Sequence, residues 1–454
     1  MFRAALLCSS IAFAAAAQGG SVPAQQPGAS AQPPGPPAAN SLTLERAVQV
    51  ALERNYDLRK AMYVAQSSEQ DLIIARSNVL PQLNFNGSVT KVRQGQGVTV
   101  VGGVPFERPV DIFTQFSGTL GLRQLVFDGG AWWNNLAAAD FTLRSTQASI
   151  DEQRLTTVYT VEQRFYELVR QQRQLKVLGD AAQRSRDQAD FTQRLFDGGR
   201  ATQADVYAAR ANRDNDEINR LGQEARVELA RQDLALTLGV DPAEPLTIAE
   251  PAAMQQDPSA PPPARNAVEK ALSQRPSLKA FALAAEAQRK NESAAKGGYW
   301  PQIFLNANYG RSTSDLPSFD DPDLSQNSQL TGGVSLSWNL FAGLSTKANV
   351  EKAQLAVLSA VNDLENGRRG VASDVERAVA QLAVAGQQAR IAAQTLQNAS
   401  ENLRLARTRQ LVGVGTQLEV RDAELKLTQS ELARANALVD GHEAESALRR
   451  ATGG

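Results

Sequence analysis

The chain contains an internal repeat with an offset of 220 residues. Residues 47–86 align without a gap with residues 267–306, so that AVQVAL matches AVEKAL and LPQLNFN matches WPQIFLN. Ten of these 40 positions are identical, and they include Pro81, which matches Pro301. A repeat of this length indicates a duplicated structural unit. It therefore predicts one architecture made of two similar halves rather than unrelated domains.

The composition excludes several classes of function. The formal net charge is −1, so nothing points to nucleic acid as a partner. The chain has one histidine, His442, and one cysteine, Cys8, which argues against a His/Cys metal site, a thiol nucleophile or a disulfide framework. No nucleophile with a base and no phosphate loop can be identified, so we expect no cofactor, no metal and no enzymatic activity. A lone histidine near a helix end, as His442 is, is expected on the surface.

The first 17 residues read as a secretory signal peptide. Arg3 precedes an Ala-rich apolar core that ends in small residues suited to cleavage. Cys8 lies too early in that core to be a lipid-anchor cysteine. Residues 18–40 hold six prolines and form a flexible leader. No later stretch has the roughly 20 apolar residues that a membrane helix needs. We therefore expect an exported chain that is either periplasmic or a β-barrel protein.

Four segments alternate between apolar and polar residues, as strands do. An amphipathic helix capped by Ser41 or Thr43 precedes them; it runs to about Asn78 and is stopped by Pro81. Each strand has about the ten residues that a tilted strand needs to cross a bilayer, although a soluble, half-buried sheet alternates in the same way. Loops of about 93–113 and 313–329 join the pairs. The predicted strands are about 82–92, 114–127, 302–312 and 330–341.

Two proline-free stretches favour the membrane alternative. Residues 110–241 and 323–454 contain no proline, which indicates long uninterrupted helices. We place the long helices at about 131–196 and 344–410, each roughly 100 Å if straight. Leucines at intervals of seven, Leu418 to Leu432 followed by Val439, predict a coiled-coil seam in the last helix. A Pro/Ala linker, residues 241–264, separates the halves.

The long helices are followed by matching turns at about 197–202 and 411–416. Gly199 aligns with Gly413, and glycine can adopt the left-handed conformation that closes a helix. Thr202 and Thr416 follow and can cap the next helix. Each turn is therefore the tip of an antiparallel helical hairpin.

The ordered set of features resembles the TolC-like outer-membrane efflux proteins. The order is helix, LPQ, strand pair, LVFDGG at Leu125–Gly130, long helix, glycine tip and returning helix; WNLFAG is similar to a second strand-to-helix junction. The resemblance covers about 41–452, in two repeats of 41–240 and 265–452. The strand–helix junction residues are Pro81, Phe127, Gly129, Pro301, Phe341 and Gly343.

The resemblance implies a mixed α and β fold assembled as a homotrimer in the outer membrane. Four strands from each chain would build a shared 12-stranded transmembrane β-barrel, and the long antiparallel helices would form a trimeric α-helical tunnel through the periplasm. Four strands cannot close a barrel, and unpaired strand edges are not tolerated in lipid, so an oligomer is required on physical grounds too. The implied partners are outer-membrane lipid, a periplasmic adaptor (membrane fusion) protein and an inner-membrane pump.

The resemblance also suggests where the pore narrows. By position, Glu419 and Asp422 match the family's acidic rings, and Asp205 matches an acidic residue of a tip latch. Symmetry would repeat each carboxylate three times and produce a cation-selective ring. The competing interpretation is that these acids only complement the dipole at a helix N-terminus.

The family's aromatic and basic latch residues are replaced here by Gln410 and Gly415, so the latch is weaker or uses Arg200 and Arg409. The glycine tips, Gly199 and Gly413 with Thr202 and Thr416, are the expected contact with an adaptor.

The leading hypothesis is a passive exit duct of a tripartite efflux or type I secretion system. The alternative is a periplasmic adaptor or structural coiled coil without a pore. Adaptors also carry long hairpins, but they lack two pairs of ten-residue amphipathic strands. The sequence does not identify the cargo.

Overall fold

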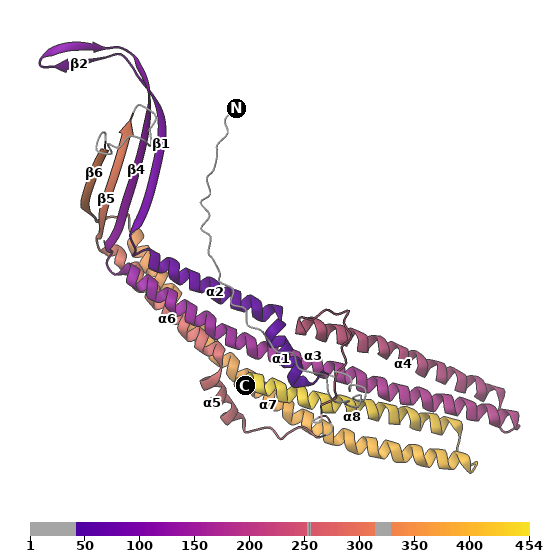
Figure 1. Ribbon diagram of the computed structural model, residues 1–454. Helices are drawn as coiled ribbons and strands as arrows, with labels where there is room; N and C mark the ends of the chain where they lie inside the picture. The colour runs from indigo at the N-terminus through magenta and orange to yellow at the C-terminus, as the bar shows by residue number, and fades with distance from the viewer. Residues whose placement is uncertain (1–41, 252–253, 255, 314–327) are drawn as a thin grey trace, which may run out of the picture. The chain divides into compact units, whose positions relative to one another are not determined.

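The computed structural model describes residues 42–251, 254, 256–313 and 328–454 (Figure 1). The expected signal peptide with Cys8, the Pro-rich leader, Ser41 and most of the expected loop at 313–329 lie outside the described residues. The description below concerns the compact unit that begins after Asn40.

The same series of elements occurs twice. Two short helices are followed by antiparallel strands, a helix of 67 residues and a helix of 36 residues. In the first half these are α1 Leu44–Arg54, α2 Tyr56–Ser77, β1 Gln82–Gln94, β4 Asp111–Phe127, α3 Ala131–Asp197 and α4 Gln203–Leu238. In the second half they are α5 Ala264–Gln274, α6 Pro276–Lys296, β5 Gln302–Thr313, β6 Ser328–Ser337, α7 Ser345–Leu411 and α8 Gln417–Thr452, with a 3-10 turn at Gly297–Tyr299.

The single helix expected up to about Asn78 is two helices, so that expectation was wrong. Thr43 caps α1 as predicted, by accepting a hydrogen bond from the Arg46 backbone. Asn55 then takes an extended conformation, caps α2 through the Leu58 N–H, and donates to the Thr237 carbonyl at 2.8 Å. The internal repeat indicates that a new helix begins at Tyr56. Tyr56 aligns with Pro276, the first residue of α6, and proline is favoured at the first position of a helix.

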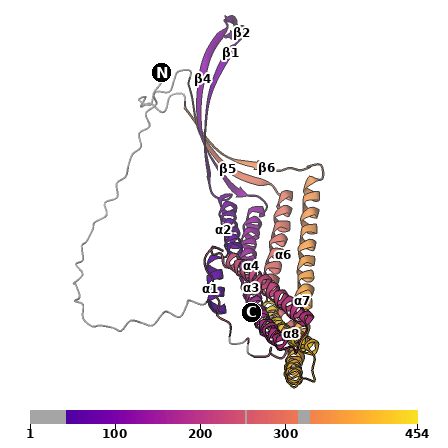
Figure 2. The same cartoon turned by 90° about the vertical axis from the view of Figure 1, so that its right-hand side faces the viewer.

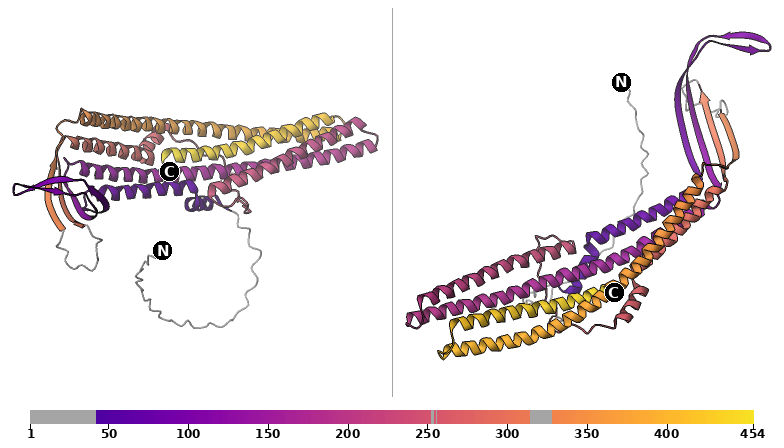
Figure 3. Two further views of the ribbon diagram at one scale, coloured as in Figure 1. Left: turned by 90° about the horizontal axis from the view of Figure 1, so that it is seen from above. Right: turned by 180° about the vertical axis from the view of Figure 1, so that it is seen from behind.

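The four longest helices form two antiparallel hairpins, α3–α4 and α7–α8 (Figures 1 and 3). α8 packs on both α7 and α3, so it joins the two hairpins. The α7–α8 contact near the tip uses Val420, Ala423 and Leu427. Within one chain the predicted seam is only partly buried, since Val439 is fully buried but Leu418 and Leu425 are 77% and 42% exposed. No described helix has the combined length and apolarity required to cross a membrane.

The main strands form one antiparallel sheet in the order β1-β4-β5-β6, which Figure 2 shows from the side. Directly paired residues lie on the same face of a sheet. The register therefore puts most of the apolar residues of the four strands on one face and most of the Asn, Ser and Thr residues on the other, with Phe113 and Phe304 among the exceptions. The apolar face comprises Leu83, Phe85, Val89, Phe116, Leu120, Leu122, Ile303, Leu305, Ala307, Tyr309, Leu330, Val334 and Leu336.

Two boundaries of the sheet differ from expectation. The segment predicted as a loop at 93–113 contains a further hairpin, β2 Gly97–Val101 and β3 Val104–Arg108. Its turn uses Gly102 and Gly103, both left-handed, and its valines suit a strand. The strand predicted to reach 341 ends at Ser337, because the chain turns there toward Gly343, which is left-handed.

A tight turn joins each strand pair to its long helix. In the first half Gly129 and Gly130 are left-handed, and Asp128 accepts a hydrogen bond from the Trp132 N–H at 2.9 Å. In the second half Gly343 and Leu344 occupy the matching positions. Leu344 has φ +68° and is the only left-handed residue other than glycine in the described part of the chain. The geometry of this turn therefore requires a conformation that leucine adopts only under strain.

The Pro/Ala segment is more than a linker between halves. Ile248 pairs with Leu42, and Met254 is fully buried in the core formed by α1, α3, α4 and α8. Pro258 packs so closely on Gly441 that a side chain there would overlap it. The segment therefore holds the two halves together.

His442 is buried at 5% exposure, so the expectation of a surface residue was wrong. Its ring stacks on Tyr166, and its Nδ1 lies 3.0 Å from Glu445 Oε2. The hydrogen bond to His442 and those from Ser259 lower the pKa of Glu445 to about 2. Small residues around it on α8 leave room for the ring. These contacts indicate that His442 has a structural role in the helical core.

Candidate functional site

Two glycine turns form the tips of the helical hairpins. Gly199 (φ +70°) lies between α3 and α4, and Gly413 (φ +82°) lies between α7 and α8. The backbone closes both turns in the same way: the N–H after the first glycine reaches back to Leu195, and the N–H after the second reaches Arg409. The turns thus have the left-handed geometry that their glycines predict.

Thr202 and Asp205 form a reciprocal cap at the start of α4. Thr202 Oγ1 accepts a hydrogen bond from the Asp205 N–H at 3.2 Å, and Asp205 Oδ2 accepts from the Thr202 N–H at 2.9 Å. The Thr202 hydroxyl and backbone together lower the pKa of Asp205. The carboxylate proposed for a latch is therefore engaged in its own helix cap, as the competing interpretation requires.

Thr416 caps α8 through the Glu419 N–H at 3.2 Å. Glu419 and Asp422 follow on α8 at a spacing of three residues, which places them on one side of the helix. Arg409 lies 3.8 Å from Glu419, and Lys426 lies 2.6 Å from Asp422. The two carboxylates are largely exposed at the end of the hairpin. Each carboxylate therefore has one basic side chain beside it. Both remain exposed, so they could line a pore if several copies of the chain were arranged symmetrically.

Gly415, one of the two latch positions suggested by the resemblance, is closely packed against the preceding helix end. A Cβ on Gly415 would come within 2.9 Å of Arg409 Cβ and of the Gln410 nitrogen, so a side chain is poorly accommodated there. Arg409 contacts its own hairpin, and Arg200 makes no ion pair among the described residues. Neither arginine forms an ion pair between the two hairpins among the described residues, and the latch role suggested for them stays a prediction.

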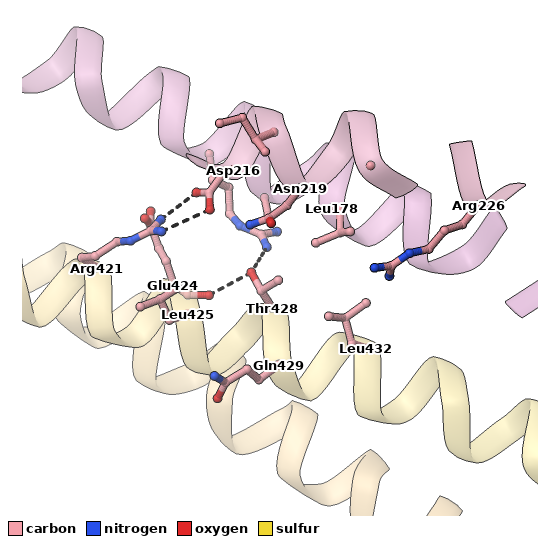
Figure 4. Close-up of a pocket in the computed structure, with 14 residues that line it drawn as sticks. Leu178, Asp216, Asn219, Arg226, Arg421, Glu424, Leu425, Thr428, Gln429 and Leu432 are labelled. Atoms are coloured by element: carbon pink, nitrogen blue, oxygen red, sulfur yellow. Dashed lines mark hydrogen bonds and ion pairs between the residues drawn. The ribbon is translucent and has the colours of Figure 1, made fainter. Parts of the chain in front are cut away.

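A different set of side chains links the hairpins. Arg421 on α8 forms a two-pronged ion pair with Asp216 on α4, at 2.7 and 3.1 Å (Figure 4). Ser185 on α3 also donates a hydrogen bond to Asp216. Both charged side chains are mostly buried, at 19% and 13% exposure. Sequence analysis missed this pair because the charges are far apart in sequence and resemble those of any solvated helix face.

Further polar contacts continue along the α3–α8 boundary. They run from the tip toward the sheet, and each joins one residue of α3 to one or two residues of α8. They are Thr192 with Gln417, Arg184 with Thr428 and Glu431, Gln174 with Asn436, Arg170 with Asp440 and Glu443, and Glu162 with Arg449. A series of polar contacts therefore joins the two hairpins, together with an apolar cluster in which Val439 of α8 lies with Val161 and Phe165 of α3.

A cavity of about 510 Å³ lies beside the Asp216–Arg421 pair, between α3, α4 and α8. Figure 4 shows that its walls combine the ion pair with Leu178 and Leu432 and with the Arg226 guanidinium. The cavity indicates that the two hairpins pack less closely on each other here than the two helices of one hairpin do.

No cluster of three or more His, Cys, Asp or Glu residues suited to a metal occurs in the described ranges. The strand–helix junction residues lie at the other end of the helices from the tips. Gly129 is the tightest of them, since a Cβ there would come within 2.6 Å of Trp300. Pro81 and Pro301 directly precede β1 and β5, Phe127 ends β4, and Phe341 and Gly343 lie between β6 and α7.

Comparisons with known proteins agree on one family. The sequence model described as "Outer membrane efflux protein" matches residues 47–240 and again 267–454. The chain is 26% identical over 439 residues to the outer membrane efflux protein BepC of Brucella suis, covering 92% of this chain and 86% of BepC. It is 24% identical to the outer membrane protein TolC of Vibrio cholerae, covering 84% and 83%. The fold is similar to that of CusC, with a TM-score of 0.78 at 19% identity over 91% of this chain and 93% of CusC.

Proposed function

The chain belongs to the outer membrane efflux protein family, and from this premise we propose that it is the trimeric exit duct of a tripartite efflux or type I secretion system. The family places the protein in the cell outer membrane, with its helices in the periplasm. The duct conducts substrates passively toward the exterior, and an inner-membrane pump supplies the energy. We also propose that the two matched series of elements arose from one duplicated unit.

The four-stranded sheet carries this proposal. Its apolar face is continuous over all four strands, and its side chains are exposed, for example Phe85 at 73% and Val334 at 71%. The strands β1 and β6 each pair on one side only among the described residues. In lipid these edges must be paired. Three copies supply twelve strands, and pairing β1 of one copy with β6 of the next closes the barrel.

The opposite face of the sheet suits an aqueous lumen. Ser88 bonds to Ser117 at 2.7 Å, and Asn306 donates to Ser335 at 2.8 Å, so that polar side chains connect neighbouring strands across this face. The 67-residue helices that continue from the strands would span about 100 Å in the periplasm. This arrangement supports the proposal that an α-helical tunnel continues from the barrel.

At the tips, threefold symmetry would gather six carboxylates from Glu419 and Asp422 into two adjacent rings. Such rings attract cations and repel anions. The second tip also exposes apolar side chains, Leu411 at 70% and Val414 at 68%, next to Gly413. This surface is the proposed contact for a periplasmic adaptor, together with the first tip at Gly199.

Single-channel recording in planar bilayers tests the duct and its gate together. The wild type is expected to conduct and to prefer cations. Replacing Glu419 and Asp422 together by Ala should raise conductance and weaken cation selectivity, because the charged constriction is removed. A matched control, Asp214→Ala with Glu224→Ala, removes two exposed carboxylates from α4 away from the tips.

The results separate the candidate functions. Unchanged conductance and selectivity in the tip variant would remove these residues from the gate but leave the duct intact. Absence of any conductance from the wild type, with the protein recovered in the soluble periplasmic fraction, would favour the periplasmic adaptor or coiled-coil alternative.

A further inference from the structure

The apolar face of the sheet ends in cations at equivalent positions of both halves. On β1 the residues of this face are Leu83, Phe85, Gly87 and Val89, followed by Lys91 and Arg93. On β5 the face begins at Ile303 and reaches Arg311. Lys91 and Arg311 are separated by the 220 residues of the internal repeat. The same boundary between apolar and basic side chains therefore occurs twice in one chain.

The register keeps opposite charges apart at this end of the sheet. Lys91 pairs with Thr114 and Arg93 with Ile112, so neither cation has an acidic partner directly across the strand. Asp111 pairs with Gln94 and so lies on the opposite, polar face. The side chains of Lys91 and Arg93 are both exposed. The side of the ribbon that continues the apolar face is thus basic.

The tryptophans mark the other end of the apolar face. All four in the chain lie at the strand–helix junction: Trp132, Trp133, Trp300 and Trp338. Three of them are more than half exposed. Tryptophan is enriched at membrane–water interfaces. From Trp300 to Arg311 the strand rises about 36 Å, or roughly 28 Å along the membrane normal at a tilt of 40°. This height is close to the ~25 Å apolar band of outer-membrane barrels.

We propose that Lys91 and Arg93, at the end of the apolar face on β1, form a basic band that binds the phosphate groups of outer-leaflet lipids. The inference rests on the proposed function, because it requires the apolar face to lie in the outer membrane. The band is then level with the lipid headgroups, where a cation contributes attraction to anionic lipid. The β1–β4 ribbon extends beyond β5 and β6 at this level, as Figure 1 shows.

Lipid binding by the full-length purified protein tests the band. Native mass spectrometry would compare adducts of diphosphorylated lipid A with those of the same lipid after removal of both phosphates. The wild type is expected to prefer the phosphorylated form. The variant Lys91→Gln with Arg93→Gln should lose about fivefold in affinity for each charge removed, the equivalent of ~1 kcal/mol per cation. Exchanging the cations, Lys91→Arg with Arg93→Lys, should retain the preference.

A control variant, Lys60→Gln with Lys352→Gln, removes two exposed cations from α2 and α7 and should bind lipid as the wild type does. Equal binding of both lipid forms by the wild type, or unchanged binding by the Lys91/Arg93 variant, would overturn the proposal. Displacement of lipid A by an equal concentration of inorganic phosphate would show a site for free phosphate and would also overturn it. Conductance is recorded on the same preparations, so failure of the duct is observed separately from failure of the lipid band.

Discussion

Two glycines with the same backbone angle have different surroundings. Gly129 and Gly199 both have φ +70°. A Cβ on Gly129 would come within 2.6 Å of Trp300 Cβ and 2.8 Å of the Gly297 carbonyl oxygen, whereas a Cβ on Gly199 would meet no atom within 4 Å. The first position therefore combines conformational strain with steric exclusion, and the second involves strain alone.

We predict that Gly129→Ala destabilises the protein much more than Gly199→Ala. The left-handed conformation costs an alanine about 1–2 kcal/mol at either position. Only at Gly129 must the Trp300 segment also move, which adds about 1–3 kcal/mol of overpacking. Apparent unfolding temperatures in detergent would measure the difference. Equal shifts for the two variants would show that the junction is not tightly packed.

At the level of elements, the boundary between the two hairpins depends on polar pairs. Arg421→Gln leaves Asp216 mostly buried beside Ser185 without its cation. Loss of one partner of a buried ion pair costs about 3–5 kcal/mol, and partial exposure reduces this to roughly 2. We predict faster amide hydrogen exchange in α4 and α8 near these residues and a higher conductance, because the hairpins separate more readily.

The double variant Asp216→Asn with Arg421→Gln should recover part of the lost protection, since no unpaired charge remains. Arg404→Gln provides a matched control, because Arg404 pairs with Glu401 within α7 and both side chains are more than half exposed. An exposed pair of this kind contributes little. If Arg421→Gln behaves like Arg404→Gln, the pair does not hold the hairpins together.

The elements differ in how far the sequence predicts them. Local patterns act within one segment, so the proline-free helices, the alternating strands and the glycine turns follow from sequence alone. The break at Asn55 could have been predicted from the repeat, in which Tyr56 aligns with Pro276. The burial of His442 depends on its contact with Tyr166, which is remote in sequence. The Asp216–Arg421 pair was missed for the same reason. Glu419 and Asp422 were assigned to the pore from the family resemblance. Their proposed role requires several copies of the chain, and a single sequence does not specify how many copies assemble.

At the scale of the whole molecule, a single chain leaves two requirements unmet. The apolar face of the sheet is exposed, and β1 and β6 each have an unpaired outer edge in the described part of the chain. Strand edges of this kind pair with other copies unless they are protected. The leucines Leu418 and Leu425, which lie at heptad spacing and are exposed within one chain, are also available to a neighbouring copy.

These requirements predict an oligomer, and family membership makes the expected oligomer a homotrimer. Light scattering of the detergent-extracted protein from the outer-membrane fraction, corrected for bound detergent, should give three times the chain mass. Two copies would supply only eight strands, and the smallest single-chain barrels have that number, so closure alone permits a dimer as well. The choice of three rests on family membership, and a measured dimer would retain the shared barrel but reject the threefold tunnel. A monomer would mean that the strand edges remain unpaired, which is incompatible with a pore in lipid.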